Sequence, residues 1–331
     1  MNLWKEITEY GADNLSAVVI RDRRMSMWTV TGPGISEQTR FQAASISKMV
    51  TSFGILRLVG EGRMDLDEDV SRYLGDLVLS RTDGSPARAT VRQILTHTAG
   101  LTVHGFDGYL RSQSIPTAEQ IILGQPPANS DPVVQEREPG EKWEYSGGGY
   151  TVLQKCVMNV TGRSFEEAMD ELVLRPLEME FSTFRQDVTE DLASGHSGGK
   201  EVEGGHMIMP ELAAAGLWTT PSDLARFGIH IQKILSGEEG IVPANLVREM
   251  VREQCRTADF GDTEKGMGLG CFLDEICGRP CFGHGGDNIG FESSAWFALD
   301  GSFGFCLMVN SDDAWKIMDK LAMYLLEEED K

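Results

Sequence analysis

The sequence has few of the features expected of a secreted, membrane-bound or disulfide-stapled protein. No apolar run approaches the about 20 residues needed to span a bilayer. The start of the chain, residues 1–6, lacks the basic and apolar segments of a signal peptide. Six cysteines in 331 residues, with no Cys-x-x-Cys pair, favour reduced thiols over a disulfide framework. These absences predict a cytoplasmic protein with no membrane partner.

Basic residues are also scarce. The chain has 30 Lys and Arg against 51 Asp and Glu, a formal net charge of −21 at pH 7. A field of that sign repels nucleic acid and anionic lipid surfaces, so neither is an expected partner. Hydrophobic residues make up 41% and charged residues 24%, as in an ordinary globular enzyme. We therefore expect a small-molecule or short-peptide substrate, while the composition leaves the oligomeric state open.

The order of the predicted elements indicates an α+β fold. Residues 15–20 and 25–30 form a predicted β-hairpin, and a helix is expected over residues 45–59, before Gly60-Glu61-Gly62. Strand patterns return late in the chain, at 267–273, 291–299 and 303–309. Two strands, many helices and then more strands fit an antiparallel sheet flanked by helices, built from both chain ends, with an inserted all-helical region.

This order also suggests two regions. Residues 1–62 and 205–331 are expected to form the sheet region. Residues 63–204, in which helical pieces alternate with Pro- and Gly-rich loops, are expected to form a mainly helical region. The active site is predicted to lie between the two.

The first candidate for chemistry is Ser45-Ile46-Ser47-Lys48, a Ser-x-x-Lys pattern. Residues three apart on a helix lie on one face, roughly 5–6 Å apart at their β-carbons, so the Lys48 amine can reach the Ser45 hydroxyl. The following turns are almost entirely apolar, which indicates a buried helix. Burial lowers the pKa of a lysine, and a deprotonated lysine can activate a serine. The alternative is a lysine that reaches solvent and a serine that caps the helix.

Two glycine-rich segments supply further candidates. Tyr145-Ser146-Gly147 precedes two more glycines, which let a backbone approach a ligand closely, although an aromatic anchor in a turn would look the same. The second segment is Phe282-Gly283-His284-Gly285-Gly286-Asp287, beside the late strands. A glycine-flanked segment at the edge of a sheet could bind a substrate and offer a backbone N–H to an oxyanion. Its histidine could donate a hydrogen bond to a substrate carboxylate or to the Tyr–Lys pair, or be structural.

Taken together and in this order, the three segments resemble the class C β-lactamase and D-alanyl-D-alanine carboxypeptidase B superfamily of serine hydrolases. The resemblance extends to residues 95–101, 216–224 and 266–270, and so to most of the chain. It implies a β-lactamase/transpeptidase-like fold with five or more antiparallel strands, and a nucleophile at the start of a buried helix.

The resemblance also implies roles for individual residues. Ser45 would attack a carbonyl, and Lys48 and Tyr145 would share the proton and return it to the leaving group. The backbone N–H groups of Ser45 and Asp287 would form the oxyanion hole, beside His284, Gly285 and Gly286. Water would then hydrolyse the acyl-enzyme, and neither a metal nor a cofactor is required.

Two positions depart from the family pattern. Gly147 replaces the usual asparagine, which contacts the substrate amide and the lysine, and His284 replaces the lysine of the Lys-Thr-Gly motif. A histidine with a reference pKa of about 6.5 is mostly neutral at pH 7, unlike that lysine. The sequence therefore predicts a hydrolase of small esters, amides or peptides with weak β-lactamase activity. His97, in the segment at 95–101, is interpreted as structural.

A second serine motif allows a different interpretation. Gly195-His196-Ser197-Gly198-Gly199 matches the nucleophile elbow of α/β-hydrolases, and Ser197 and Lys200 form a second Ser-x-x-Lys. The flanks of this segment do not predict the strand and helix that an elbow needs, and its glycines disfavour a helix. A different class of function is a catalytically silent scaffold, or a protein that binds cell-wall fragments or penicillin. A buried lysine beside a serine argues against the scaffold.

Overall fold

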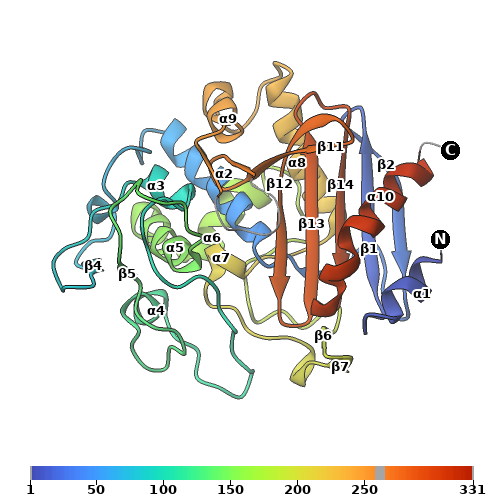
Figure 1. Ribbon diagram of the computed structural model, residues 1–331, viewed down its shortest axis with the longest axis horizontal. Helices are drawn as coiled ribbons and strands as arrows, with labels where there is room; N and C mark the ends of the chain where they lie inside the picture. The colour runs from blue at the N-terminus through green and yellow to red at the C-terminus, as the bar shows by residue number, and fades with distance from the viewer. Residues whose placement is uncertain (1, 258–264, 330–331) are drawn as a thin grey trace.

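The computed structural model describes residues 2–257 and 265–329 (Figure 1). Residues 1, 258–264, 330 and 331, which belong to the predicted sheet region, lie outside the described residues. The fold is α+β, as predicted: a large antiparallel sheet forms one side of the molecule, and most of the helices gather on the other (Figure 1). The division of the chain into two regions stays a prediction.

The large sheet joins strands from both ends of the chain. Its order across the described residues is β2 (Arg24–Thr31), β1 (Leu15–Arg21), β14 (Phe303–Val309), β13 (Phe291–Ala298), β12 (Arg279–Asn288), β11 (Phe272–Ile276), β10 (Gly266–Met267) and β9 (Cys255–Arg256). All neighbouring pairs are antiparallel. Because β1 pairs with β14, Leu15 lies opposite Val309. The N-terminal hairpin is therefore completed by late residues.

Most of the predicted strands are confirmed, with one correction. The predicted hairpin corresponds to β1–β2, and the strands predicted at 291–299 and 303–309 correspond to β13 and β14. The single strand expected at 267–273 is wrong: β10 and β11 are separate strands that pair with each other through Gly266 and Leu273. The chain turns between them at Gly270, whose φ of +76° suits glycine. The segment at 282–287 is part of β12, a strand of 10 residues.

The remaining strands form three small two-stranded sheets: β3 (Phe41–Gln42) with β8 (Trp218–Thr219), β4 (Ser80–Arg81) with β5 (Val134–Gln135), and β6 (His196–Ser197) with β7 (Lys200–Glu201). The α-helices are α1 (Leu3–Thr8), α2 (Ile46–Gly60), α3 (Val91–Leu95), α4 (Ala118–Leu123), α5 (Gly147–Thr161), α6 (Phe165–Met169), α7 (Leu212–Ala215), α8 (Pro221–Leu235), α9 (Ala244–Met250) and α10 (Met318–Glu329). Short helical turns of other types are η1 (Val70–Arg72), η2 (Asp170–Leu174), η3 (Glu203–Gly205) and η4 (Asp312–Ile317).

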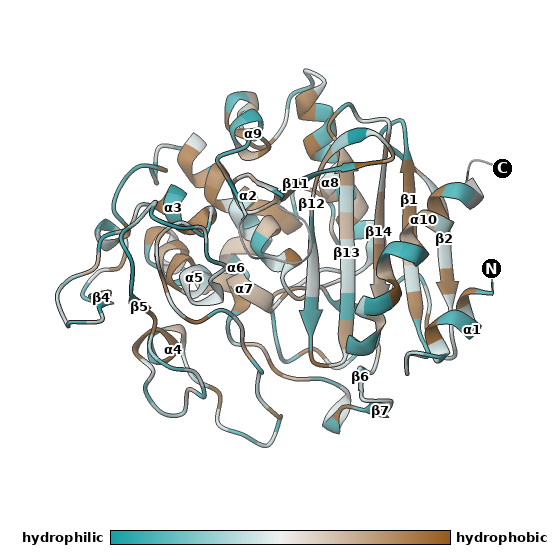
Figure 2. Ribbon diagram, in the orientation of Figure 1, coloured by the Kyte–Doolittle hydropathy of each residue, from teal (hydrophilic) through white to brown (hydrophobic). Residues whose placement is uncertain are grey.

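The sheet is covered on both faces. Helix α8 packs against one face of β1 and β14, and α10 packs against the other. The side chains of β1 alternate between the two faces, so Val18 and Ile20 join one apolar cluster and Ala17 and Val19 the other. This explains why β1 is apolar along its length, and Figure 2 shows apolar residues gathered in such interior elements.

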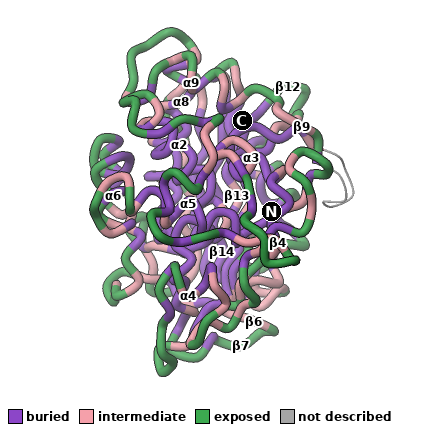
Figure 3. Tube along the Cα trace, turned by 90° about the vertical axis from the view of Figure 1, so that its left-hand side faces the viewer, coloured by how far each residue is buried: buried purple, intermediate pink, exposed green. Residues whose placement is uncertain are grey.

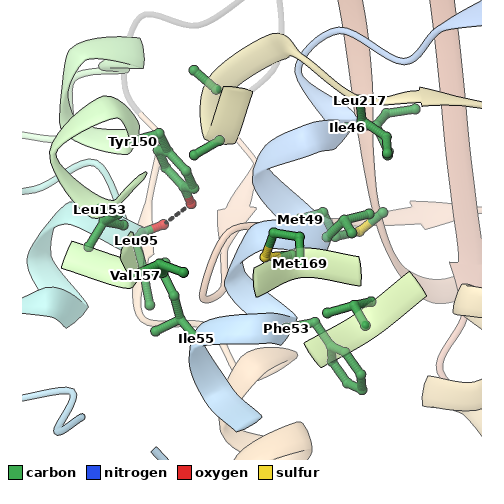
Figure 4. Close-up of a cluster of buried hydrophobic side chains, with 14 of the residues drawn as sticks. Ile46, Met49, Phe53, Ile55, Leu95, Tyr150, Leu153, Val157, Met169 and Leu217 are labelled. Atoms are coloured by element: carbon green, nitrogen blue, oxygen red, sulfur yellow. Dashed lines mark hydrogen bonds between the residues drawn. The ribbon is translucent and has the colours of Figure 1, made fainter. Parts of the chain in front are cut away.

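Helix α2 lies in the interior, between the sheet and the other helices (Figures 1 and 3). Twelve of its 15 residues are buried. Figure 4 shows Met49 beside Met169 of α6, and both belong to the same buried apolar cluster as Phe53. Among the described residues, no helix combines the length and apolarity that crossing a lipid bilayer requires.

Candidate active site

Ser45 is held where three parts of the chain meet. It is the N-cap residue of α2, and the preceding Ala44 has a left-handed φ of +46°, a strained conformation for alanine. Ala43 is fixed on both sides, because its N–H donates to Leu217 O (2.8 Å) and its carbonyl accepts from Ser293 Oγ (2.9 Å). The segment that leads into α2 is thereby tied to Leu217, just before β8, and to Ser293 in β13, which fixes the position of Ser45.

Lys48 lies one turn after Ser45 and is buried, with 2% of its surface exposed. Its Nζ is 3.0 Å from Ser45 Oγ and 2.7 Å from the carbonyl oxygen of Ala214 in α7. No carboxylate among the described residues forms an ion pair with it. Burial without a counter-ion lowers the pKa of Lys48 to about 7. The alternative of a lysine that reaches solvent is therefore wrong.

Tyr145 completes the group. Its hydroxyl shares a hydrogen bond with the Ser45 side chain, and burial raises the pKa of the phenol above its usual value of about 10. The Lys48 Nζ lies 4.9 Å from the centre of the Tyr145 ring. A proton shared by these groups is therefore held more readily by the tyrosine oxygen than by the lysine nitrogen.

His97 holds the tyrosine segment in place. Its Nδ1 accepts a hydrogen bond from the Ser146 N–H (3.1 Å), and its carbonyl accepts one from the Glu144 N–H (2.9 Å). Its ring lies 4.3 Å from the Tyr145 ring, measured between centroids. The structural interpretation of His97 is consistent with these contacts, all of which converge on Tyr145 and its neighbours.

The second half of β12 forms an open edge beside Ser45. Strand β11 pairs with β12 only up to Gly283, so residues 284–288 pair with β13 on one side alone. Gly286 approaches α2 so closely that a β-carbon there would lie 2.2 Å from Ala43 O and 3.0 Å from Ser45 N. Only glycine permits this approach, which explains one of the glycines in the motif.

The structure does not support the expectation that His284 donates a hydrogen bond to a substrate carboxylate. Its Nδ1 is hydrogen-bonded to the carbonyl of Gly285, so Nδ1 carries the hydrogen and Nε2 is the acceptor nitrogen. Burial and the nearby Lys48 lower the pKa of the imidazole to about 3. A neutral ring with its N–H already used cannot donate to a substrate carboxylate. His284 Nε2 is buried and has no hydrogen-bond partner among the described residues.

Ser45, Tyr145 and the open edge of β12 border a cavity of about 530 Å³. The residues that line it and were expected from the sequence are Ser45, Tyr145, His284, Gly285, Gly286 and Asp287. Lining residues for which the sequence held no signal include His104, Lys142, Glu144, Phe272 and Glu292. Glu144 forms an ion pair with Arg137. Loops and strand register, rather than any motif, bring the second group to the cavity.

Comparison with known proteins agrees with this geometry. A family model described as Beta-lactamase matches residues 3–328. The chain belongs to the Beta-lactamase family. Protein flp of Staphylococcus aureus (strain N315) is 28% identical over 192 residues, covering 56% of this chain and 36% of flp, so the chain spans about a third of that relative. Esterase EstB of Burkholderia gladioli is 25% identical over 333 residues, covering 87% of this chain and 81% of EstB.

Solved structures show the same fold. A D-stereospecific amidohydrolase from Streptomyces sp. is 24% identical, with a TM-score of 0.76 over 93% of this chain and 92% of that chain. At that identity the likeness establishes the fold alone. The predicted resemblance to the class C β-lactamase and D-alanyl-D-alanine carboxypeptidase B superfamily is thus confirmed at the level of the Beta-lactamase family and the fold.

The glycine that replaces the family's asparagine is covered by an aromatic ring. A β-carbon on Gly147 would lie 2.9 Å from Phe106 Cε2. Gly147 begins α5 and is not among the described residues that line the cavity, whereas its neighbour Tyr145 is. Contact between Gly147 and substrate stays a prediction.

The competing serine motif lies elsewhere. His196 and Ser197 form β6, which turns through Gly198 and Gly199 (φ +57° and +73°) into β7. Ser197 therefore faces Lys200 across a two-residue hairpin, and no helix brings the pair together. It has neither the strand-to-helix turn of a nucleophile elbow nor a place in the cavity described above.

Proposed function

We propose that this protein is a serine hydrolase that forms an acyl-enzyme on Ser45. The observation that carries the proposal is the Lys48 amine, buried without a carboxylate partner and 3.0 Å from the Ser45 hydroxyl. With a pKa of about 7, roughly half of this amine is unprotonated at neutral pH, and its lone pair can accept the hydroxyl proton.

The proton balance assigns a separate task to each partner. As Ser45 Oγ bonds to the substrate carbonyl carbon, its proton passes to the Lys48 nitrogen, whose other N–H is held by Ala214 O. When the tetrahedral intermediate collapses, Tyr145 gives its phenolic proton to the departing oxygen or nitrogen and regains one from Lys48. The raised pKa of Tyr145 suits it to act as this acid. Water then reverses the sequence and releases the acid product.

The developing oxyanion requires donors in the same corner. The backbone N–H groups of Ser45 and Asp287 are proposed for this purpose. The close approach of Gly286 to Ser45 N brings the two backbones together. The loss of one such donor typically costs about 3–4 kcal/mol of transition-state stabilisation.

For the substrate we propose small esters and amides with short acyl groups, including short peptides. The relatives support this range, since one is named an esterase and another a D-stereospecific amidohydrolase. Gly147 and the neutral His284 support weak activity on β-lactams, because the usual asparagine and lysine are both absent. The six free cysteines support a reducing, cytoplasmic setting.

Labelling with a fluorophosphonate probe tests the proposal. We expect the intact mass to increase by one adduct, and Ser45→Ala to abolish the increase. Ser197→Ala is the matched control and should be labelled like the parent protein. If the folded protein takes up no label, the scaffold interpretation replaces the proposed function; a label on Ser197 would overturn the assignment of the nucleophile.

A further inference from the structure

One end of the cavity is acidic. Asp287, near the end of β12, lies directly opposite Glu292, near the start of β13, and both line the cavity that contains Ser45. Asp312 is a third carboxylate nearby, and it accepts a hydrogen bond from Gly290 N–H (3.1 Å) in the turn between the two strands. Two ionised carboxylates directly opposite on paired strands would destabilise a sheet, so this arrangement favours a retained proton on one of them until a cation is present.

Glu292 is the unusual member of this cluster. It is 7% exposed, and among the described residues its carboxyl group has neither a hydrogen-bond donor nor a basic partner. Burial, with Asp287 and Asp312 nearby, raises the pKa of Glu292 to about 9. A buried carboxyl group without a partner destabilises the fold. Glu292 is therefore a candidate for binding a ligand that carries a positive charge.

A second buried acceptor faces the same cavity. His284 is 2% exposed. Its Nε2 carries a lone pair, and no hydrogen-bond donor reaches this atom among the described residues. Lys142 is the one lysine or arginine among the described lining residues. The cavity therefore has a buried acceptor without a donor at His284 on β12, and a carboxyl group without a partner among the described residues at Glu292 on β13.

The orientation of the bound substrate determines which part of it contacts the acidic end of the cavity. If Tyr145 protonates the leaving group, that group lies on the side of Tyr145 and His284, whose rings are 6.3 Å apart. The acyl chain then extends the other way from Ser45, past Gly286 and toward Asp287 and Glu292. Along β12 these positions follow one another in sequence.

We propose that the substrate's acyl group carries a protonated amine, bound by Glu292 with Asp287 beside it. This inference rests on the proposed function. Glu292 releases its proton to solvent when the ammonium group arrives, so that the bound state is an ion pair between carboxylate and ammonium. The enzyme is then selective for aminoacyl esters, amides or peptides over neutral acyl compounds of the same length.

Matched nitroanilides test the selectivity. Glycyl, β-alanyl and 4-aminobutyryl p-nitroanilides are compared with the propionyl, butyryl and pentanoyl compounds, in which a methyl group replaces the amine. For at least one pair we expect kcat/KM to be at least tenfold higher for the amino compound. Glu292→Gln should lower that ratio at least tenfold, whereas Glu275→Gln, an exposed acid on β11, should not change it.

The two proposals fail in different ways. If Ser45 is labelled by the fluorophosphonate but every matched pair is hydrolysed with a ratio near one, the amine site is wrong and the hydrolase proposal stands. If no label is taken up, the hydrolase proposal itself fails. The ratio of the parent enzyme is informative even if Glu292→Gln does not fold, and an unchanged ratio in a folded Glu292→Gln variant would overturn the role of Glu292.

Discussion

The imidazole of His97 and the phenol of Tyr145 lie ring against ring, 4.3 Å apart, while the same imidazole accepts the N–H of Ser146. A residue outside the cavity lining thus determines where the proposed acid is placed. His97 also has a left-handed φ of +58°, which asparagine and glycine tolerate better than other residues.

These contacts give the first prediction. His97→Asn keeps an acceptor near the Nδ1 position and suits the backbone, whereas His97→Gly suits the backbone and removes the acceptor. We expect kcat on a nitrophenyl ester to fall at least tenfold in His97→Gly, with little change in KM, and to fall much less in His97→Asn. Equal losses in two folded variants would show that the hydrogen bond to Ser146 is unimportant.

The pH dependence of acylation should follow Lys48. Because the pKa of this amine is about 7, the rate of fluorophosphonate labelling should rise with pH through about 7 and then level off. Lys48→Arg keeps a permanent charge and should label at a small fraction of the parent rate at every pH. A rise centred near pH 10 in the parent protein would instead assign the titrating group to Tyr145 or to a solvated lysine.

Lys48 and Tyr145 should act as a unit. Lys48→Ala and Tyr145→Phe are each expected to lower kcat by about a hundredfold or more, the scale of positioned acid–base catalysis. The double variant should lose much less than the sum of the two free-energy changes, since each group depends on the other. Full additivity, measured with the same ester, would mean that the two groups act in separate steps.

Activity on β-lactams should be weak. We expect measurable turnover of short-acyl nitrophenyl esters and little turnover of nitrocefin. Gly147→Asn alone should not improve nitrocefin turnover, because its β-carbon would collide with the Phe106 ring. Gly147→Asn combined with Phe106→Ala tests whether the asparagine then acts. Efficient nitrocefin turnover by the parent protein would reverse the proposed order of substrates.

Glu211 provides a prediction about stability. Both of its carboxyl oxygens are buried without hydrogen-bond partners among the described residues, and burial raises the pKa of Glu211 to about 8. Between pH about 4.3 and 8 the unfolded chain releases a proton that the folded chain keeps, so the free energy of unfolding falls as pH rises.

Glu211→Gln removes this effect. We expect it to raise Tm more at pH 8 than at pH 5, with a stabilisation of about 2–4 kcal/mol at the higher pH. Glu203→Gln, at an exposed position, is the control and should change Tm little at either pH. An equal shift of Tm at pH 5 and pH 8 would contradict the raised pKa.

Much of the fold could be predicted because its signals are local. The apolar run after Ser45 predicts a buried helix, and α2 is buried as expected. The boundary between β10 and β11 could not be predicted, because it depends on Gly270, where a β-carbon would lie 1.8 Å from Ser52 Oγ on a distant helix. Strand β12 is not among the strands that the sequence predicts, because three glycines interrupt the alternating pattern typical of a strand.

The site divides in the same way. Ser45, Lys48 and Tyr145 belong to short motifs whose spacing carries their chemistry. Glu292 has no such motif, and it reaches the cavity because strand register places it opposite Asp287. The charge state of His284 also depends on tertiary surroundings, because burial and Lys48, rather than residue type, set its pKa.

The pairing of β1 with β14 has a consequence for biosynthesis. A ribosome makes α2 and its serine before the edge of β12 that faces the serine, and all of residues 61–278 are made in between. The free edge of β1 in the β1–β2 hairpin likewise stays unpaired until β14 has been made. Domains tend to fold as units once complete, so we expect nascent chains stalled before residue 279 to be inert toward the phosphonate probe. The arrangement keeps the serine from becoming reactive until β12 has been made.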